Sequence, residues 1–317
     1  MDLLRAFGRS SPRVVAGIIK FAFLHWRGRT PKGLHFKHGA VVAALSRAGD
    51  GVSIEQTRKL YNRGRSKNAV IEAKWATAID GKGWTGFWIP FQYEVPDAKT
   101  GCDASTLGQG CDLVLLYTHG GGFMYGHPLQ NIVFMTELIH HTFVTKGIRL
   151  SFLAIDYNGD SAGGNLAHVL PLKIRDECPE LGLPIGTITS SPYMFSPHPM
   201  DISLYDFITP LVCQRFVRAY SHYDPSTLAS SYYTPLNAES LAGLPPMLVF
   251  IGGLEQFRPS IECFVKKAQA DKCAVKVILA EARAHCWFLT PAISTPQDRV
   301  DAIEACTQFL AKILKEE

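Results

Sequence analysis

A chain of 317 residues, 47% of them hydrophobic, is long and apolar enough to form one large α/β domain or two smaller ones. Its net charge of +4 is too small to indicate nucleic acid as a partner. The eight cysteines form no C-x-x-C pair, so they indicate neither a zinc ribbon nor a thioredoxin-like site and fit reduced thiols in a cytoplasmic protein.

The first 40 residues are strongly basic, with eight Lys or Arg side chains and a single acid, Asp2. The apolar run at 14–26 is interrupted by Lys20 and is too short and too charged to span a bilayer. Its apolar residues recur near helical spacing, at Val14, Ile18, Phe21 and Leu24. We expect an amphipathic helix that either packs over the core, within an N-terminal helical cap at 1–60, or makes peripheral contact with a membrane.

From residue 61 onward, strand-like and helix-like segments alternate. Residues 70–95 are rich in β-branched and aromatic side chains around a turn at 80–83, which predicts an antiparallel hairpin. Short apolar runs that predict buried strands lie at 112–118, 150–157, 186–195, 247–253 and 274–282. Helical patterns lie at 131–146, 162–171 and 297–315.

Strands that alternate with helices predict an α/β fold, a mostly parallel sheet covered by helices on both faces. We therefore expect a core domain at 61–317 that follows the N-terminal cap at 1–60. Aromatic residues and prolines at about 200–240 interrupt the alternation and indicate an insertion over the edge of the sheet.

The residues Gly159, Asp160, Ser161, Ala162 and Gly163 form a G-x-S-x-G pattern between a predicted strand and a predicted helix. In this motif a sharp turn exposes the serine, and the flanking glycines let the backbone segments approach one another. The pattern alone is weak, but its position at a strand–helix junction favours Ser161 as a nucleophile.

A second motif, His119-Gly120-Gly121-Gly122-Phe123, ends the predicted strand at 112–118. Backbone without side chains can turn its N–H groups toward a developing oxyanion. The alternative is a glycine-rich turn in which His119 only makes structural hydrogen bonds.

The motifs HGGGF and GDSAGGNLAH together resemble the hormone-sensitive-lipase-like branch of the α/β-hydrolase esterases. The similarity continues through YTPLNAESLAGLPPMLVFIGGLEQF and covers roughly residues 70–315. The resemblance implies the α/β-hydrolase fold with an N-terminal helical cap.

Carried over residue by residue, the resemblance implies an acyl-enzyme mechanism in which Ser161 is the nucleophile, Glu255 the acid and His285 the base. It also implies an oxyanion hole formed by the backbone N–H groups of Gly121, Gly122 and Ala162. The order Ser, acid, His along the chain is the one that this fold requires. The alternative for Glu255 is a surface acid paired with Arg258.

The chain departs from the family pattern directly before the nucleophile. Family members place a turn, a helix and a further strand there, whereas here the strand at 150–157 runs straight into the serine motif. A deletion of about one βα unit, roughly thirty residues, would explain this.

The remaining strand must serve as the fourth or the fifth of the family's sheet order 1-2-4-3-5-6-7-8. The fifth position would bring Ser161 to the glycine loop but leave a gap beside the hairpin, and the fourth would place Ser161 on the wrong side of the third strand.

These features predict a serine hydrolase that cleaves a small or medium acyl or aryl carboxylic ester. An amidase or formamidase is a close variant, and the analogy with fungal relatives suggests secondary metabolism. We expect an aromatic pocket, lined by Phe21, Phe23, Trp26, Phe207, Phe216, Tyr220 and Tyr223. No motif indicates a metal or another cofactor, since neither H-E-x-x-H nor a phosphate loop occurs.

The alternative from another class is a catalytically impaired relative, either a binding protein or a truncated variant. The complete set of Ser161, Glu255 and His285 argues against it, and the shortened core argues for it. The sequence leaves the oligomeric state open.

Overall fold

A computed structural model of the protein describes residues 12–51, 55–57, 68–81, 83–91, 108–155, 160–195, 205–222 and 224–316. Its helices are α2 (Pro12–Trp26), α3 (Phe36–Gly51), α5 (Ala69–Trp75), α6 (Ile132–Lys146), α7 (Ala162–Glu177), α8 (Pro210–Tyr220), α9 (Arg258–Ala270) and α10 (Pro296–Glu316). Its strands are β1 (Thr77–Gly81), β2 (Trp84–Ile89), β3 (Leu113–Thr118), β4 (Leu150–Ile155), β5 (Thr187–Ser190), β6 (Met247–Gly252) and β7 (Val275–Ala280). In the described residues the 3₁₀ turns are η3 (Pro179–Leu181), η4 (Pro225–Ala229), η5 (Pro235–Asn237) and η6 (Trp287–Leu289).

The strands form two sheets instead of one continuous sheet. The first has the order β1-β2-β4-β3, in which β1, β2 and β4 pair antiparallel and β3 pairs parallel with β4. The second has the order β5-β6-β7 and is entirely parallel. Among the described strands, none pairs with both β3 and β5, so the ladder is interrupted between them.

Strand β4 takes the fourth position of the two that the sequence allows. It lies between β2 and β3, with Phe152 opposite both Ile89 and Leu115. Most of its residues are buried, as expected for a strand with neighbours on both edges and helices over its faces.

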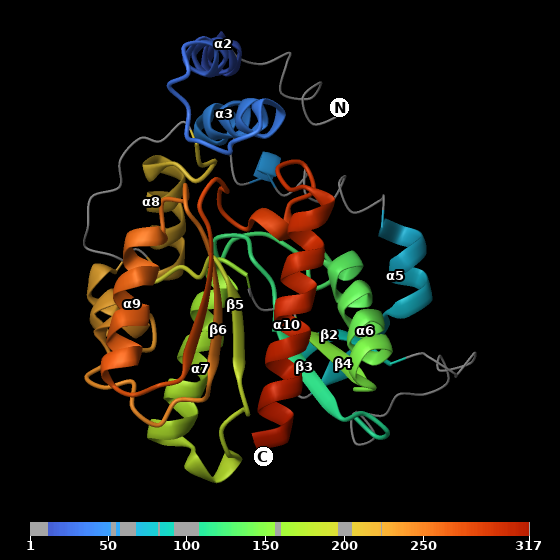
Figure 1. Cartoon of the computed structure of the whole chain (residues 1–317). Coiled ribbons are helices and arrows are strands. Elements are labelled where there is room, and N and C mark those ends of the chain that lie inside the picture. The colour runs from blue at the N-terminus through green and yellow to red at the C-terminus, as the bar shows by residue number, and fades with distance from the viewer. Residues whose placement is uncertain are drawn as a thin grey trace.

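Two layers of side chains cover the second sheet, as the alternation along β6 shows. Leu248 and Phe250 belong to a core shared with α6, β4 and α10. Met247, Val249 and Ile251 belong to the opposite core, with α8 and α9. Because the first of these cores also contains residues of β2 and β4, helices α6 and α10 pack across both sheets (Figure 1).

Two predicted elements differ in extent from the structure. The predicted hairpin at 70–95 begins with a helix, α5, because its first residues include the good helix formers Glu72, Ala73 and Lys74. Helix α7 continues past Pro171 to Glu177, although proline removes one helical hydrogen bond. Val169 and Leu172 are buried on either side of this proline, and their burial outweighs the local preference to end the helix.

The N-terminal helices α2 and α3 stack on one another at one end of the molecule (Figure 1). Two glycines permit the close approach. A Cβ atom on Gly17 would lie 3.0 Å from the Ala43 carbonyl oxygen, and one on Gly39 would lie 2.2 Å from the Phe21 ring. Helix α3 in turn contacts α8, where the Arg215 guanidinium donates a hydrogen bond to a carbonyl of α3.

We predict that Gly86→Ala destabilises the first sheet, because a Cβ atom at this position would lie 2.6 Å from the Ala154 carbonyl oxygen in β4. Forcing the two strands apart should lower the free energy of unfolding by about 1–3 kcal/mol. Urea denaturation measures this loss. The exposed neighbour Thr85→Ala serves as the control and should change stability by less than about 0.5 kcal/mol. Equal midpoints for the two variants would contradict the close packing of β2 on β4.

Candidate active site

Ser161 occupies a sharp turn immediately before α7. Its φ of 61° and ψ of −102° are unusual for a residue with a side chain, and only 7% of it is exposed. Its N–H donates to the Ser190 carbonyl oxygen at 3.1 Å, and its own carbonyl accepts from the Tyr193 N–H at 2.8 Å. The turn is therefore held at the end of β5, in the second sheet.

The Asp160 carboxylate ties the same turn to the first sheet. Its Oδ1 accepts hydrogen bonds from the Tyr117 hydroxyl at 2.5 Å, the Gly120 N–H at 3.0 Å and the Asn131 amide at 3.1 Å. Tyr117 lies on β3 and Gly120 in the loop that follows it. Ser161 is thus placed between β3 and β5, beside the glycine loop.

This placement corrects the expectation that a strand in the fourth position would put Ser161 on the wrong side of β3. That expectation assumed that the serine stays in line with its preceding strand. The five steps from Ile155 to Asp160 can span up to about 17 Å. Two strand spacings measure only about 10 Å, so the chain can cross the end of β3. Gly159 lies in this segment, outside the described residues.

The loop after β3 requires its glycines. Gly121 and Gly122 have φ values of 138° and 60°. A Cβ atom on Gly120 would lie 2.4 Å from the Asp160 carbonyl oxygen, and one on Gly122 would lie 2.4 Å from the Phe216 ring. The loop therefore lies directly against the serine turn, and an oxyanion hole formed by Gly121, Gly122 and Ala162 needs this proximity.

His119 supports the glycine loop from within the protein. It is 3% exposed, and its Nδ1 lies 2.9 Å from the Gly120 carbonyl oxygen. On the other side of the serine, the Gly163 carbonyl accepts a long hydrogen bond of 3.5 Å from the Thr118 hydroxyl. The first contact lies within the loop after β3, and the second joins the end of β3 to the start of α7.

Glu255 and His285 form a buried pair. Glu255 Oε2 lies 3.1 Å from His285 Nδ1, and the side-chain exposures are 0% and 3%. The other carboxylate oxygen accepts from the Gly252 N–H at 3.1 Å, at the end of β6. Arg258 instead bridges Glu262 and Glu281, so Glu255 is not the surface partner of that arginine.

The N-terminal helices pack on the residues next to this pair. Val42 of α3 packs in one cluster with Ala284 and Phe207, next to His285. A second cluster joins Phe21, Leu34 and Ala43 to Leu254, next to Glu255. Residues of α2 and α3 thus pack on Leu254 and Ala284, which directly precede Glu255 and His285.

Opposing effects act on the imidazole. Burial alone would lower the pKa of His285, but the neighbouring Cys286 sulfur and Glu255 carboxylate hold it well above its ordinary value. Burial raises the pKa of the Cys286 thiol, and the neighbouring His285 imidazole opposes that rise. Both neighbours thus favour the imidazolium, and Glu255 is the one that contacts its Nδ1.

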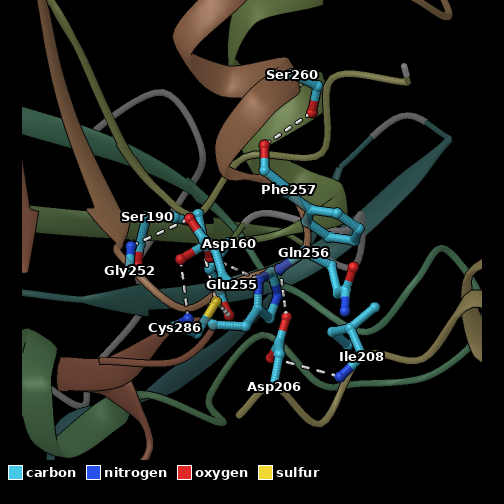
Figure 2. A network of polar contacts seen from close by, with 12 residues as sticks. Asp160, Ser190, Asp206, Ile208, Gly252, Glu255, Gln256, Phe257, Ser260 and Cys286 are labelled. Atoms are coloured by element: carbon cyan, nitrogen blue, oxygen red, sulfur yellow. Dashed lines mark hydrogen bonds and ion pairs between the residues drawn. The ribbon is translucent and has the colours of Figure 1, made fainter. Parts of the chain in front are cut away.

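Asp206 is a neighbour of the pair that the sequence did not reveal. It is 1% exposed, and its carboxylate accepts hydrogen bonds from the Gln256 N–H at 2.7 Å and the Ile208 N–H at 3.4 Å (Figure 2). Burial raises the pKa of Asp206 to about 6, against the opposing field of the His285 imidazole. The residue thus anchors the loop that carries Glu255. Only its position in the insertion hinted at a role.

Cys286 brings the histidine loop to the serine turn. Its Sγ lies 4.0 Å from Asp160 Oδ2 and 3.9 Å from the Ser190 carbonyl oxygen, which also accepts from the Ser161 N–H (Figure 2). Its N–H donates to the Ser191 hydroxyl at 2.9 Å. The Glu255–His285 pair and the serine turn therefore meet around the end of β5.

Within the described part of the chain, no hydrogen bond joins the Ser161 hydroxyl to the His285 ring. The site consists of two assembled halves, the serine turn with its glycine loop and the Glu255–His285 pair. Polar contacts of Cys286 with Asp160 and with the Ser190 carbonyl connect the two halves.

Three of the side chains expected to line an aromatic pocket lie near the candidate site. The Phe207 ring centre lies 5.7 Å from that of His285, Phe216 covers Gly122, and Tyr220 stacks on Phe123 at 3.6 Å. The N-terminal aromatics do not join them: Phe21 is buried against α3, whereas Phe23 and Trp26 are 54% and 79% exposed. Tyr223 lies outside the described residues. Across the residues that the structure describes, no three His, Cys, Asp or Glu side chains gather as metal ligands.

Comparisons with known proteins agree with this architecture. The profile of a family described as alpha/beta hydrolase fold matches residues 145–289, the segment that holds Ser161, Glu255 and His285. The sequence has no significant match among curated proteins.

Similar solved structures are esterases of bacteria and fungi. A thermostable esterase from Pseudomonas putida is 18% identical over 90% of this chain and 99% of its own, with a TM-score of 0.66. A fungal esterase from Rhizomucor miehei is 17% identical over 90% and 98% of the two chains, with a TM-score of 0.69. An esterase/lipase from an uncultured bacterium is 18% identical over 96% and 100%, with a TM-score of 0.63. The chain has the α/β-hydrolase fold that these esterases share.

Proposed function

We propose that the protein is a serine hydrolase that cleaves small or medium acyl or aryl carboxylic esters. The main support for this proposal is the buried Glu255–His285 pair. The pair lies beside the strained turn of Ser161 and beside a loop whose close packing and positive φ values require glycine. These are the parts that an acyl-transfer site needs: a nucleophile, an oriented base and donors for the oxyanion.

In the proposed mechanism, Ser161 Oγ attacks the ester carbonyl carbon while His285 Nε2 takes its proton. Glu255 accepts the Nδ1–H of His285, fixes the tautomer and stabilises the imidazolium. The oxyanion receives hydrogen bonds from backbone N–H groups of the glycine loop and the start of α7. The imidazolium then protonates the leaving alcohol, and water hydrolyses the acyl-enzyme by the same steps.

The Ser161–His285 hydrogen bond would form when substrate binds. Catalytic hydrogen bonds are often long or misaligned in proteins without substrate and tighten in the complex. Rotation of the serine side chain, with a small shift of the histidine loop around Cys286, is the movement that we propose. The same atoms would also cleave an amide or a formamide.

The aromatic side chains near the glycine loop favour an apolar acyl group. Phe123 and Tyr220 stack on one another, and Phe216 lies against Gly122, where the acyl carbonyl would bind. A similar solved structure, the esterase EstE5, was soaked with p-nitrophenyl butyrate. This short acyl ester is therefore a suitable first substrate.

A second candidate is a catalytically impaired relative that binds a ligand. The interrupted ladder between β3 and β5 and the absence of a Ser161–His285 hydrogen bond among the described residues favour it. On this account a deletion of about one βα unit before the nucleophile has removed the strand of the fifth position. The two candidates differ in whether Ser161 reacts.

We expect Ser161→Ala to lower kcat/KM for p-nitrophenyl butyrate by at least about 10³-fold and to abolish labelling by a fluorophosphonate, because the attacking oxygen is lost. Ser46→Ala is the matched control, since Ser46 is buried in α3 and bonds only within its own helix. Equal rates in wild type and Ser161→Ala would remove Ser161 as nucleophile. A folded wild type that neither hydrolyses nor labels would favour the impaired relative.

The pH dependence tests the acid–histidine pair. Because His285 acts as a base only when neutral and its pKa is raised, kcat/KM should still be rising with pH above pH 7. Glu255→Gln removes the carboxylate, one of the two groups that raise this pKa. The rising limb should therefore move to lower pH, while the plateau falls by roughly 10³–10⁴-fold.

Glu262→Gln is the control for the pH profile, since Glu262 pairs with Arg258 on the surface. It should leave both the limb and the plateau unchanged. A lower plateau in Glu255→Gln with an unmoved limb would contradict the proposed effect of Glu255 on the imidazole.

Asp160→Ala should impair both stability and reaction. It leaves the donors of Tyr117, Gly120 and Asn131 without their shared acceptor, at a cost of about 1.5–3 kcal/mol in the free energy of unfolding. Labelling at Ser161 should slow at the same time, because the serine turn and the glycine loop lose their link. Urea denaturation and labelling rates measure the two effects.

Asp176→Ala is the matched control, a partly exposed acid paired with Arg175, and should cost less than about 1 kcal/mol. Asp160→Asn keeps an acceptor oxygen and should recover part of the loss. If Asp160→Ala labels as fast as wild type, the carboxylate does not position the serine.

A further inference from the structure

Helix α2 presents a row of large apolar side chains to solvent. Val15, Ile19, Phe23 and Trp26 are 51%, 62%, 54% and 79% exposed. At the helical rotation of about 100° per residue, these four positions fall within an arc of about 80°. The site described above does not use this face.

The opposite face of α2 is already covered. Val14, Gly17 and Phe21 are buried against α3, so the apolar character of the exposed row is not needed to hold the helix on the protein. Figure 1 shows α2 as the outermost layer at its end of the molecule, above α3. The helix thus has one apolar face inside the protein and a second one outside it.

Positive charge flanks the exposed row. Arg13, Lys20 and Arg27 are exposed and recur every seven residues, which places them along one side of the apolar arc. The Arg27 guanidinium lies 5.7 Å from the centre of the Phe23 ring. Residues 12–49 contain seven Lys or Arg and no Asp or Glu. The apolar face is therefore bordered by three basic side chains, in a segment that contains no acid.

The positive charge beside this face distinguishes between two binding partners, a second copy of the chain and a phospholipid surface. A symmetric contact with a second copy would bring the same basic rows together, which is unfavourable. An anionic phospholipid surface offers negative charge beside an apolar layer and fits both features at once. In the described residues no helix has the length and hydropathy to cross a membrane, and α2, at 15 residues, is short enough to lie along the surface.

We infer that α2 docks the protein on an anionic phospholipid surface. Val15, Ile19, Phe23 and Trp26 enter the boundary between headgroups and acyl chains, and Lys20 and Arg27 lie at the level of the lipid phosphates. The inference rests on the exposure and charge of α2 and does not depend on the proposed hydrolase activity.

Flotation of the full chain with vesicles tests this inference. We expect binding to phosphatidylcholine vesicles that contain 30 mol% phosphatidylserine, little binding to pure phosphatidylcholine, and weaker binding at high salt. Lys20→Gln with Arg27→Gln should lower the partition coefficient by about 25-fold, at about fivefold for each charge. Ile19→Ser with Trp26→Ser should lower it by roughly tenfold or more.

Matched controls come from another exposed helix, α10. Val300→Ser removes a side chain that is 53% exposed, and Lys312→Gln removes an exposed charge. Both should bind vesicles as wild type does. Since all these positions are at the surface, circular dichroism and urea midpoints should be unchanged in every variant.

Three results would overturn the inference. The first is equal binding to neutral and anionic vesicles, and the second is binding that survives both pairs of substitutions. The third is a wild-type dimer that ignores vesicles and dissociates on Ile19→Ser with Trp26→Ser, which would assign the face to a second copy. Hydrolysis of p-nitrophenyl butyrate in solution should not change in these variants, so the failure of one proposal is distinguishable from the failure of the other.

Discussion

The Asp160 carboxylate is the contact on which the arrangement of the site depends. In the described strands the ladder stops at β3 and resumes at β5, so backbone pairing does not fix how the two sheets meet. One oxygen of Asp160 gathers donors from β3, from the glycine loop and from the start of α6. The next residue, Ser161, is bonded to the end of β5. A single turn therefore joins the two sheets at the point where the chemistry is proposed.

Charge-assisted hydrogen bonds are suited to aligning the two sheets because they are short and directional. Apolar packing alone does not set a position to within a hydrogen-bond length.

Apolar packing supplies the cohesion that the interrupted ladder lacks. Helices α6 and α10 share one core with β2, β4 and β6, and α7 contacts both β3 and β5. Burial in this shared core keeps the sheets together without strand pairing. The helices fix the distance between the two sheets by packing against both of them. Polar contacts fix how the ends of the sheets align, and these involve Asp160, Ser190 and Cys286. The serine turn is consequently less supported by backbone than a turn that follows its own strand, and its geometry rests on side chains.

The sequence predicted local features well and long-range pairing poorly. The strand at β6, the helix α10 and the serine turn follow from short apolar patterns and glycines that act within a few residues. The split of the sheet depends on which strand edges pair with one another, and no local sequence pattern determines that pairing.

Asp206 was missed for the same reason, since its partner Gln256 lies 50 residues further on. Glu255 was left with two interpretations because an acid near an arginine has the same pattern whether it is buried or exposed. The exposed fractions of the two side chains, 0% for Glu255 and 3% for His285, and their 3.1 Å contact show that Glu255 is buried with His285.

The N-terminal helices connect the two proposals physically. Helix α2 has apolar residues on two faces, and periodicity alone does not tell which face the protein covers. In the structure α3 covers the face of Phe21 and also packs on the residues beside Glu255 and His285. The uncovered face of Ile19 and Trp26 points away from that contact. A membrane on this face would therefore lie one helical layer above α3, and α3 itself packs on Ala284 and Leu254, which precede His285 and Glu255. Helix α3 also contacts α8, whose Phe216 ring lies against Gly122. The N-terminal helices are thus linked by packing to the residues beside the Glu255–His285 pair and, through α8, to the glycine loop.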